Sequence, residues 1–395
     1  MRHPTKKAAI AVLALAVLSG CATVQVSGPA ASTAVAPAET PRASAPGRFT
    51  AGARPQADAD GYRPPLRLAV LLPQSGSLAT AAGPVRDGLL SAYYGERRRR
   101  PELQFYDTAG TAEGAASAYG RALADGADQV LGPLGRDEVD AVFRVMRPEV
   151  PLVALNRPVS PAPPNAASYA LAPEDEGIAA ADFLAAREAR RVLVLSNGDD
   201  TARRSIAAFD GQLRAQGGSI VQTLAVVGDK PADMTALLQG AAQREGGIDA
   251  VYLALRAPQA RLLAAQLSAA GLAGKPRVAT SQITSGSNAA QDVALDGIAF
   301  PADAWTAGGV SGLPDAARTG ATLPTARGPA ARLFAFGYDA WLISAYLERL
   351  ASGRDDGMRS ASGTLRIDDK GNVLRKPAWS TYSSGHAVPL AGSGG

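Results

Sequence analysis

The sequence predicts an α/β protein in which two doubly wound, parallel-sheet lobes follow a disordered N-terminal tether. From residue 66 onward, short apolar runs that end in polar turns alternate with helical stretches. Strands that alternate with helices build parallel sheets covered on both faces. This part of the chain has roughly 320 residues, more than one core usually holds, so we expect two lobes. A segment dominated by Ala, Pro, Ser, Thr and Gly precedes them.

Residues 1–20 have the pattern of a lipoprotein signal peptide. Arg2, Lys6 and Lys7 form a basic start, and Ala8–Val17 is an apolar stretch of the length of a signal-peptide core. It is about half as long as a membrane-spanning helix. Leu18-Ser19-Gly20-Cys21 follows it and resembles a lipobox, in which the cysteine is lipidated and becomes the new N-terminus. We therefore expect cleavage before Cys21; an ordinary signal peptide with an incidental cysteine is the alternative.

Cys21 is the only cysteine of the chain, so no disulfide can form within it in the oxidising compartment where disulfides persist. Several acyl chains on one residue anchor a protein far more firmly than a single chain does. Ala22 follows where an Asp would resemble an inner-membrane retention signal, so we expect the outer membrane, facing the periplasm. No second apolar run reaches membrane-spanning length, which leaves lipid as the expected anchor.

Composition excludes few function classes. The formal charge of +4 includes three cations of the signal peptide, so the cleaved chain carries +1 and gives no reason to expect nucleic acid as a partner. Hydrophobic residues at 46% and charged residues at 19% are typical of a globular chain with a large core.

We expect residues 21–65 to form a disordered linker, because such a composition cannot bury enough apolar surface to offset its ordering entropy. Its prolines favour extension. At about 3.1 Å per residue, the 44 residues after Cys21 would reach on the order of 140 Å at most.

The strands are predicted in chain order from their apolar runs. Leu66–Leu72 ends at Pro73, and a helical pattern follows it from Leu78 to Tyr93. Further predicted strands, each before a helical or turn segment, are Leu103–Tyr106, Gln129–Leu131, Leu152–Leu155, Arg191–Leu195, Ile220–Val227, Ala250–Leu255 and Arg277–Ala279. Ala-rich helices are predicted between the early strands, including Thr111–Asp125 and Asp137–Met146.

Short motifs then occur in the order seen in the LppC/LpoA lipoproteins, and the chain resembles that family from about Leu66 to Pro389. No one of these motifs is decisive, but the ordered set is specific. They are Tyr106-Asp107-Thr108, Val130-Leu131-Gly132-Pro133-Leu134, Ala154-Leu155-Asn156-Arg157-Pro158, Ala170-Leu171-Ala172-Pro173-Glu174-Asp175-Glu176, Asp249-Ala250-Val251-Tyr252, Phe336-Gly337-Tyr338-Asp339-Ala340-Trp341 and Gly363-Thr364-Leu365-Arg366-Ile367.

The resemblance implies an outer-membrane lipoprotein that activates a class A penicillin-binding protein, a peptidoglycan synthase, by direct contact. It also implies a domain similar to type I periplasmic binding proteins, with two lobes crossed by three hinge strands. We assign this domain to residues 66–389 and a tail to 390–395. Lobe 1 is expected at about 66–172 and 278–360, and lobe 2 at about 173–277 and 361–389. Larger family members carry helical repeats before this domain; no repeat of about 34 residues is visible here.

The sequence offers few catalytic residues. The two histidines are His3, in the signal peptide, and His386 near the C-terminus, so a histidine-based triad or a zinc site lacks its usual parts. Walker-type and dinucleotide glycine loops are absent from the sequence. We predict no catalytic residue, metal or cofactor. The three acids Glu174–Glu176 are expected to serve a helix N-terminus, where they favour the dipole.

A cleft between the lobes would be lined by loops at the carboxyl ends of strands. Backbone amides of the first such loop, at a helix start, are suited to a carboxylate or phosphate. The alternative is structural: Ser75 caps the helix, and Asn156 and Arg157 shape a turn. The candidate cleft residues are Gln74, Ser75, Ser77, Leu134, Gly135, Asn156, Arg157, Asp175, Asn197 and Gln282.

The charged run Arg97, Arg98, Arg99 and Arg100 is the candidate partner contact. It suits an acidic protein surface, anionic lipid or a glycan polymer; a solvated helix end is the alternative. The aromatic residues Phe334, Tyr338 and Trp341 share one helical face, which predicts core packing.

Two functions from different classes remain. The first is an interaction protein that regulates a peptidoglycan synthase. The second, suggested by the same fold, is a solute-binding lipoprotein of an amino-acid-type ABC transporter, which needs a carboxylate for a ligand amine and an aromatic shelf. Asp175 would supply the carboxylate, but aromatic residues total only 5%. A cell-wall hydrolase is disfavoured by the missing histidines.

Overall fold

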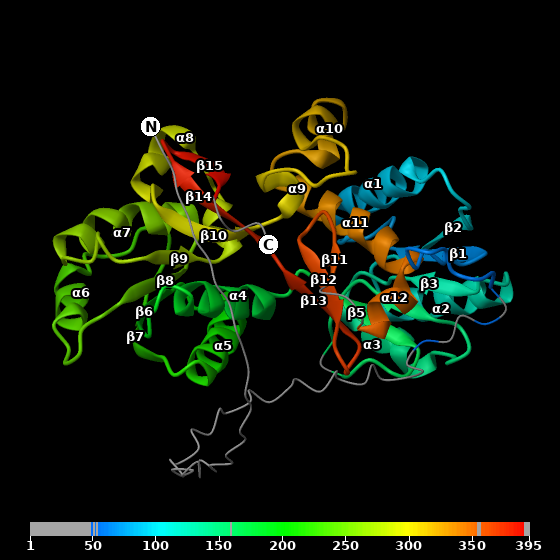
Figure 1. The fold of residues 1–395 in the computed structure, drawn as a ribbon, viewed down its shortest axis with the longest axis horizontal. Helices are drawn as coiled ribbons and strands as arrows, with labels where there is room; N and C mark the ends of the chain where they lie inside the picture. The colour runs from blue at the N-terminus through cyan, green and yellow to red at the C-terminus, as the bar shows by residue number, and fades with distance from the viewer. Residues whose placement is uncertain (1–48, 50–51, 53, 159, 354–356, 391–395) are drawn as a thin grey trace, which may run out of the picture. The chain divides into compact units, whose positions relative to one another are not determined.

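The computed structural model describes residues 49, 52, 54–158, 160–353 and 357–390 (Figure 1). The expected signal peptide, Cys21, most of the expected linker and residues 391–395 of the expected tail lie outside the described residues. In the part of the chain that is described, no helix is both long and apolar enough to cross a membrane.

Eight strands form the first sheet. They are β1 (Arg67–Leu72), β2 (Glu102–Asp107), β3 (Gln129–Leu131), β4 (Leu152–Ala154), β5 (Ala166–Tyr169), β11 (Met358–Arg359), β12 (Thr364–Ile367) and β13 (Asn372–Lys376). Their order is β11-β12-β13-β5-β4-β3-β1-β2. β1 to β5 pair in parallel, as β13 does with β5, whereas β11, β12 and β13 pair antiparallel.

Seven strands form the second sheet. They are β6 (Arg191–Ser196), β7 (Ser219–Ala225), β8 (Ala250–Ala254), β9 (Arg277–Ala279), β10 (Ile298–Ala302), β14 (Ala378–Ser383) and β15 (His386–Pro389). Their order is β15-β14-β10-β9-β8-β6-β7. β6 to β10 pair in parallel, and β14 and β15 add antiparallel strands at one edge.

Helices lie on both faces of the parallel part of each sheet, so the predicted α/β class with two lobes is confirmed (Figure 1). Lobe 1 carries α1 (Ala79–Gly95), α2 (Ala112–Ala124), α3 (Arg136–Val145), α9 (Ala304–Ala307), α10 (Ala316–Thr322), α11 (Ala330–Ala345) and α12 (Leu347–Ser352), with the short 3-10 helix Pro324–Ala326. Lobe 2 carries α4 (Pro173–Ala185), α5 (Asp200–Ala215), α6 (Thr235–Ala242), α7 (Ala257–Ala269) and α8 (Ala289–Asp292), with the 3-10 helices Ser281–Thr284 and Val293–Leu295.

Strand β1 shows why an uninterrupted apolar run marks a strand buried on both sides. Leu68, Val70 and Leu72 enter the core that contains Trp341, whereas Ala69 and Leu71 enter the core on the other face. Successive side chains point to opposite faces of a sheet. Both faces are therefore apolar, and the alternation typical of half-exposed strands is lost.

Helices α1 and α11 approach each other closely through paired glycines. A Cβ on Gly88 would lie 1.9 Å from the Phe334 carbonyl oxygen, and one on Gly337 would lie 1.9 Å from that of Val85. Both positions therefore exclude larger residues. On the same helix, Phe334 and Trp341 are buried and Tyr338 is half-buried, which confirms the predicted packing role of this aromatic face.

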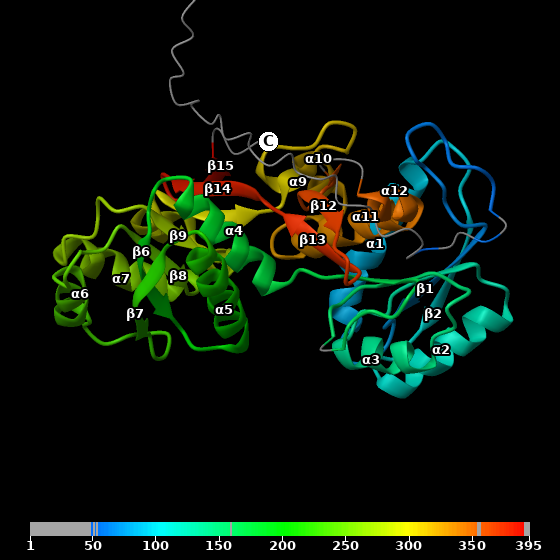
Figure 2. The same cartoon turned by 60° about the horizontal axis from the view of Figure 1, so that its bottom comes forward.

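The chain crosses between the sheets three times: from β5 to α4, from β10 to α9 and from β13 to β14. Figure 2 shows the last crossing, in which β13 leads directly into β14. The expected lobe boundaries at residues 278 and 360 were wrong. β9 and β10 continue the second sheet, so the second crossing falls near Asp303, and β12 and β13 return to the first sheet. Lengths of apolar runs predict strands but do not indicate which sheet a strand joins.

Residues 54–65, expected within the disordered linker, pack on lobe 1. Tyr62 is 2% exposed, and its hydroxyl donates to the Arg99 carbonyl oxygen at 2.7 Å. Arg54 is 8% exposed and donates to Asp128 and Gln129, each at 2.9 Å. The linker prediction was wrong here, because one buried tyrosine and one buried arginine fix a segment whose composition is otherwise that of a disordered chain.

Candidate functional site

The first expected cleft loop already holds a carboxylate of the chain itself. Gln74, Ser75 and Ser77 follow β1 and are exposed. The backbone N–H groups of Gln74 and Ser75 donate to Asp107 Oδ1 at 2.8 and 3.3 Å, and Ser75 Oγ donates to Asp107 Oδ2 at 2.7 Å. Donation from the Ala109 N–H, from Ser75 and from Gln74 lowers the pKa of Asp107 to about 2.

The alternative in which Ser75 caps α1 does not hold, because the helix begins at Ala79 and its N-cap residue is Leu78, which forms no side-chain cap. The amides that suit an external anion are partly occupied by Asp107. The hydrogen bonds from this loop to Asp107 therefore hold the carboxyl ends of β1 and β2 together.

Leu134, Gly135, Asn156 and Arg157 come together at the ends of β3 and β4. Asn156 Nδ2 donates to the Leu134 carbonyl oxygen at 2.9 Å, and Asn156 Oδ1 accepts from the Arg157 N–H at 2.9 Å. Gly135 is the N-cap residue of α3 and donates its N–H to Glu138. These contacts shape the two loops, as the structural alternative for Asn156 proposes.

Arg157 connects lobe 1 to Asp175 in the first turn of α4. The guanidinium lies 3.3 Å from Asp175 Oδ1 and donates to the Val373 carbonyl oxygen at 3.2 Å. Burial raises the pKa of Asp175, and Arg157 and Arg375 oppose that rise. Because Asp175 is 5% exposed and already paired, its carboxylate has little freedom to receive a ligand amine.

Asn197 and Gln282 meet at Asp199 in lobe 2. Asn197 Nδ2 and Gln282 Nε2 donate to Asp199 Oδ2 at 3.0 and 3.3 Å. Asp199 also caps α5 by accepting the Ala202 N–H at 2.7 Å. The ten candidate residues thus fall into separate groups around Asp107, the β3 and β4 loops with Asp175, and Asp199.

A charge cluster lies where the chain crosses between the lobes, and sequence reasoning missed most of it. Glu176, Asp303 and Arg375 are buried in it, and Ser281 and Arg332 are half-buried. Glu176 in α4 is 4% exposed; it accepts from Arg332 of α11 at 2.5 Å and from the Ser281 N–H and hydroxyl at 2.9 and 2.7 Å. Arg375 of β13 lies 3.7 Å from Glu176 and 3.4 Å from Asp303. We call Glu176, Ser281, Asp303, Arg332 and Arg375 the hinge cluster.

The hinge cluster contains charges from both lobes. Glu176 and Ser281 belong to lobe 2, Arg332 and Arg375 to lobe 1, and Asp303 to a crossing. Burial raises the pKa of Glu176, but Arg332, Arg375 and the Ser281 N–H outweigh it and hold that pKa below its ordinary value. Burial raises the pKa of Asp303 despite the two arginines. The cluster therefore ties the lobes through an ionised Glu176.

Two features of the sequence would have indicated the hinge cluster. Glu174, Asp175 and Glu176 are consecutive acids at the start of α4. One or two acids are enough to interact favourably with a helix dipole, so a third indicates that a cation lies nearby. In β13, the pattern Val373, Leu374, Arg375 places the arginine on the same face as the buried valine.

The arginine run is only partly available to a partner. Arg98 pairs with Glu96 at 2.9 Å and Asp60 at 3.0 Å, and its guanidinium lies 3.7 Å from the centre of the Tyr62 ring. Arg100 lies over the rings of Tyr93 and Tyr94. Among the described residues, the exposed Arg97 and Arg99 side chains form no hydrogen bond or ion pair.

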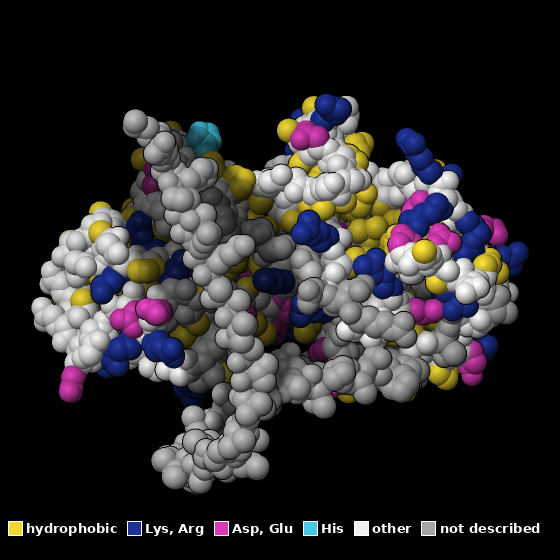
Figure 3. Space-filling model, in the orientation of Figure 1, with side chains coloured by type: hydrophobic (Ala, Val, Ile, Leu, Met, Phe, Trp, Pro, Cys, Tyr) yellow, Lys and Arg dark blue, Asp and Glu magenta, His cyan; other side chains and the backbone are white. Residues whose placement is uncertain are grey.

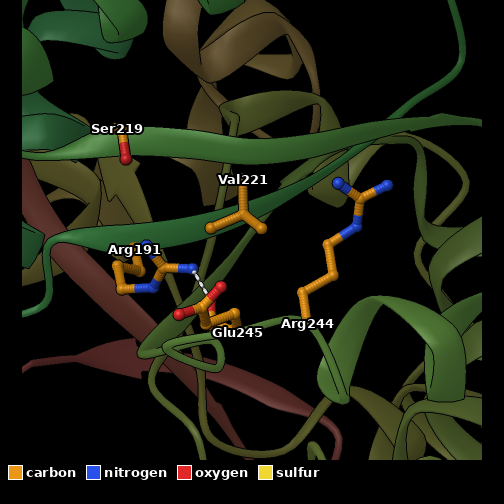
Figure 4. Close-up of a pocket in the computed structure, with 5 residues that line it drawn as sticks. All are labelled: Arg191, Ser219, Val221, Arg244 and Glu245. Carbon is orange, nitrogen blue, oxygen red and sulfur yellow. Dashed lines mark hydrogen bonds between the residues drawn. The ribbon is translucent and has the colours of Figure 1, made fainter.

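A surface hollow of about 360 Å³ lies at the start of β6 and β7, away from the expected cleft loops (Figure 4). Arg191, Ser219, Val221, Arg244 and Glu245 line it, and Arg191 donates to the Glu245 carbonyl oxygen. None of the ten candidate cleft residues contributes to it. In the described parts of the chain, no group of three or more His, Cys, Asp or Glu side chains is placed to hold a metal ion.

Comparison with known proteins places these features in context. A family model described as "LppC putative lipoprotein" matches residues 62–385. The penicillin-binding protein activator LpoA of Edwardsiella piscicida is 26% identical over 328 residues, which cover 73% of this chain and 46% of the relative. The protein of the same name from Photobacterium profundum is 26% identical over 355 residues, covering 82% and 57%. The chain thus spans about half the length of the curated relatives it matches.

Solved structures support the fold. The LpoA C-domain of Haemophilus influenzae, described as a regulator of PBP1A, superposes with a TM-score of 0.70 at 22% identity over 82% of this chain and 100% of that domain. A structure from Chromobacterium violaceum, described as a "putative branched-chain amino acid ABC transporter", gives 0.65 at 29% identity over 80% of this chain and 100% of that one.

Proposed function

Because the chain belongs to the LppC lipoprotein family, we propose that it is a lipid-anchored regulator that binds and activates a class A penicillin-binding protein. It acts without catalysing a reaction and without a cofactor. The observation that carries the proposal is the family match, which spans both lobes, together with curated relatives named as penicillin-binding protein activators. Fatty acids on Cys21 would hold it in the outer membrane, facing the periplasm.

The geometry of the described residues supports a binding role. The ionisable groups at the crossings, Glu176, Asp303 and Arg375, are buried and paired with one another rather than presented to a substrate. Asp175, the carboxylate expected for a ligand amine, is paired with Arg157.

We assign the partner contact to Arg97 and Arg99. Both are exposed, whereas Arg98 and Arg100 are engaged with side chains of lobe 1. Two free guanidinium groups suit an acidic protein surface and increase the rate of association more than the final affinity.

The test uses the mature chain with Cys21 replaced by Ala, mixed with the class A synthases of the same bacterium. We expect micromolar or tighter binding and faster glycan polymerisation and crosslinking. R97E/R99E should weaken binding at low salt, whereas K230E/K275E, which makes the same charge change at exposed lysines of lobe 2, should not. Absence of binding to every class A synthase would refute the proposal.

Solute capture is the second candidate, favoured by the 29% identity to the structure from Chromobacterium violaceum, which extends over the whole of that chain. If this function holds, a small metabolite such as an amino acid will raise the unfolding temperature of the chain, and no synthase will bind. The pairing of Asp175 with Arg157 argues against it, because the carboxylate that a ligand amine needs is neutralised within the chain.

A further inference from the structure

We propose that the exposed face of β11, β12 and β13 carries a binding site for a small oxyanion group, a carboxylate or a phosphate, formed by Arg359, Thr364 and Lys376. The site lies on lobe 1, outside the expected cleft loops and outside the arginine run. It does not depend on the regulatory function proposed above.

The strand register places the three residues in one row. Arg359 is paired with Thr364 across β11 and β12, and Thr364 is paired with Lys376 across β12 and β13. Directly opposite residues of antiparallel strands project from the same face of the sheet. Neighbouring strands lie about 4.8 Å apart. The two cationic residues therefore stand about 10 Å apart at their backbones, with a hydroxyl between them.

This spacing suits one shared anion. Arg and Lys side chains are long enough to lean toward each other above a threonine and to contact one oxyanion together. Arginine binds a carboxylate or a phosphate through two parallel hydrogen bonds, lysine adds a point charge, and the Thr364 hydroxyl supplies a further donor.

A small pocket opens at this row. It has a volume of about 190 Å³ and is lined by the three residues of the row, with Ser311 and the backbone of Gly363 among the others. The residues that line it include two cations and no acid. The volume is below that of typical drug-sized pockets of about 300–1,000 Å³, so the site accepts a single anionic group rather than a whole metabolite.

The two cations differ from most arginines of the structure. Arg359 and Lys376 are exposed, and among the described residues neither forms a hydrogen bond or an ion pair. Arg375, the neighbour of Lys376, points to the opposite face and pairs with Asp303. In Figure 3, Lys and Arg side chains gather near the centre of the drawn face, around β11 to β13. Two cations beside one pocket repel each other, and a bound anion relieves that repulsion.

The test is a titration of the mature chain, with Cys21 replaced by Ala, followed by amide NMR. Sodium phosphate and sodium acetate are the probes, at constant ionic strength set with chloride. We expect saturable shifts of the Gly363, Thr364 and Lys376 amides, with a dissociation constant on the order of 1–10 mM for such an exposed site. Saturation by phosphate alone would identify a phosphate site, and saturation by both probes a general oxyanion site.

R359Q/K376Q is the decisive variant. It should weaken binding at least tenfold, whereas K230Q/K275Q removes the same charge from exposed positions of lobe 2 and should leave the dissociation constant unchanged. Because the substituted side chains are exposed, the unfolding midpoint should stay the same. Shifts that do not saturate, or that weaken equally in both variants, would overturn the proposal and leave only general screening by salt.

Discussion

Replacement of Glu176 by Gln should destabilise the chain more than any single exposed substitution. The carboxylate is 4% exposed and accepts from Arg332 and from two donors of Ser281, with Arg375 at 3.7 Å. Glutamine keeps the size and one acceptor oxygen. Its amide nitrogen, however, must face a group that donates a hydrogen bond to the carboxylate in the wild type. The negative charge that compensates two arginines is also lost.

The size of the loss in stability follows from the removal of a buried charge. Breaking a buried ion pair by removing one member costs about 3–5 kcal/mol, because the other charge stays buried without compensation. Hydrogen bonds to a charged group contribute about 1.5–3 kcal/mol each, but they are already part of that cost. We therefore expect a loss of about 3–5 kcal/mol at pH 7, a large share of the typical 5–15 kcal/mol of a folded protein.

Equilibrium urea unfolding of wild type and E176Q at pH 7 measures this loss, and E149Q is the control because Glu149 is exposed. A second series runs to lower pH. The folded-state pKa of Glu176 lies below its ordinary value of 4.5, so its stabilisation is complete above that pH and disappears as the pH falls through the folded pKa. The difference between wild type and E176Q should therefore shrink below about pH 4.5.

A loss in the free energy of unfolding below about 1 kcal/mol at pH 7 would refute the reasoning, because the Glu176 carboxylate would then contribute no more than an exposed ion pair does. A difference that stays constant at low pH would refute the assigned ionisation. Because Glu176 bridges elements of both lobes, amide exchange at residues 170–172 should also be faster in E176Q.

Two further predictions concern lobe 1. D339N should destabilise the chain by about 1–3 kcal/mol at pH 7, because one of the buried N–H groups of Ala361 and Ser362 loses its acceptor. Burial raises the pKa of Asp339 from 3.8 to about 6. The free energy of unfolding of the wild type therefore falls as the pH rises through that range, whereas that of D339N does not change on this account. The difference between the two free energies of unfolding should narrow by up to about 3 kcal/mol. Urea unfolding midpoints of wild type and D339N at the two ends of this pH range measure the change, with D229N as control. A difference in stability that widens as the pH rises would contradict the prediction. R54A should release residues 54–65 at a cost of about 1–3 kcal/mol, since buried Gln129 loses a partner. Faster amide exchange of Arg63, which R97A should leave unchanged, is the readout, and equal exchange in both variants would show that Arg54 does not hold the segment.

The sequence was sufficient for the family and for eight of the fifteen strands in the described residues, β1 to β4 and β6 to β9, but β5 and β10 to β15 were not predicted. The predicted strand at Gln129–Leu131 and that at Arg277–Ala279 have the same bounds in the structure, because buried parallel strands are short apolar runs closed by turns. The ordered motifs predicted the family, and the match over residues 62–385 confirms it. Its motif Phe336–Trp341 contains the glycine of the α1–α11 contact and the buried Asp339.

The sequence could not predict side-chain pairs whose members lie far apart along the chain. Glu176 meets Arg332 from 156 residues away, and Arg54 meets Asp128 from 74 residues away. Local patterns such as the alternation in β13 indicate which face of a strand a residue occupies, but they do not encode which distant residue it pairs with. The segment 54–65 likewise had the composition of an exposed, polar chain. The cleft residues were chosen by the rule that strand ends line a cleft. Several of them, including Ser75 and Asn197, bond to acids of their own lobe.

The packing of residues 54–65 changes the reach that a lipid anchor at Cys21 would allow. With those residues held on lobe 1, a linker such as the sequence predicts would comprise at most the 33 residues 21–53, which would reach about 100 Å at full extension, instead of the 140 Å expected for residues 22–65. Tyr62 and Arg54 also fix the end of the tether beside the amino ends of β1 and β3, because Arg54 contacts Asp128 and Gln129 there. A tether rarely occupies its full length, since extension costs conformational entropy. If the chain is anchored at Cys21 and binds a synthase of the opposite membrane, the shorter segment would leave more of the distance for that synthase to span.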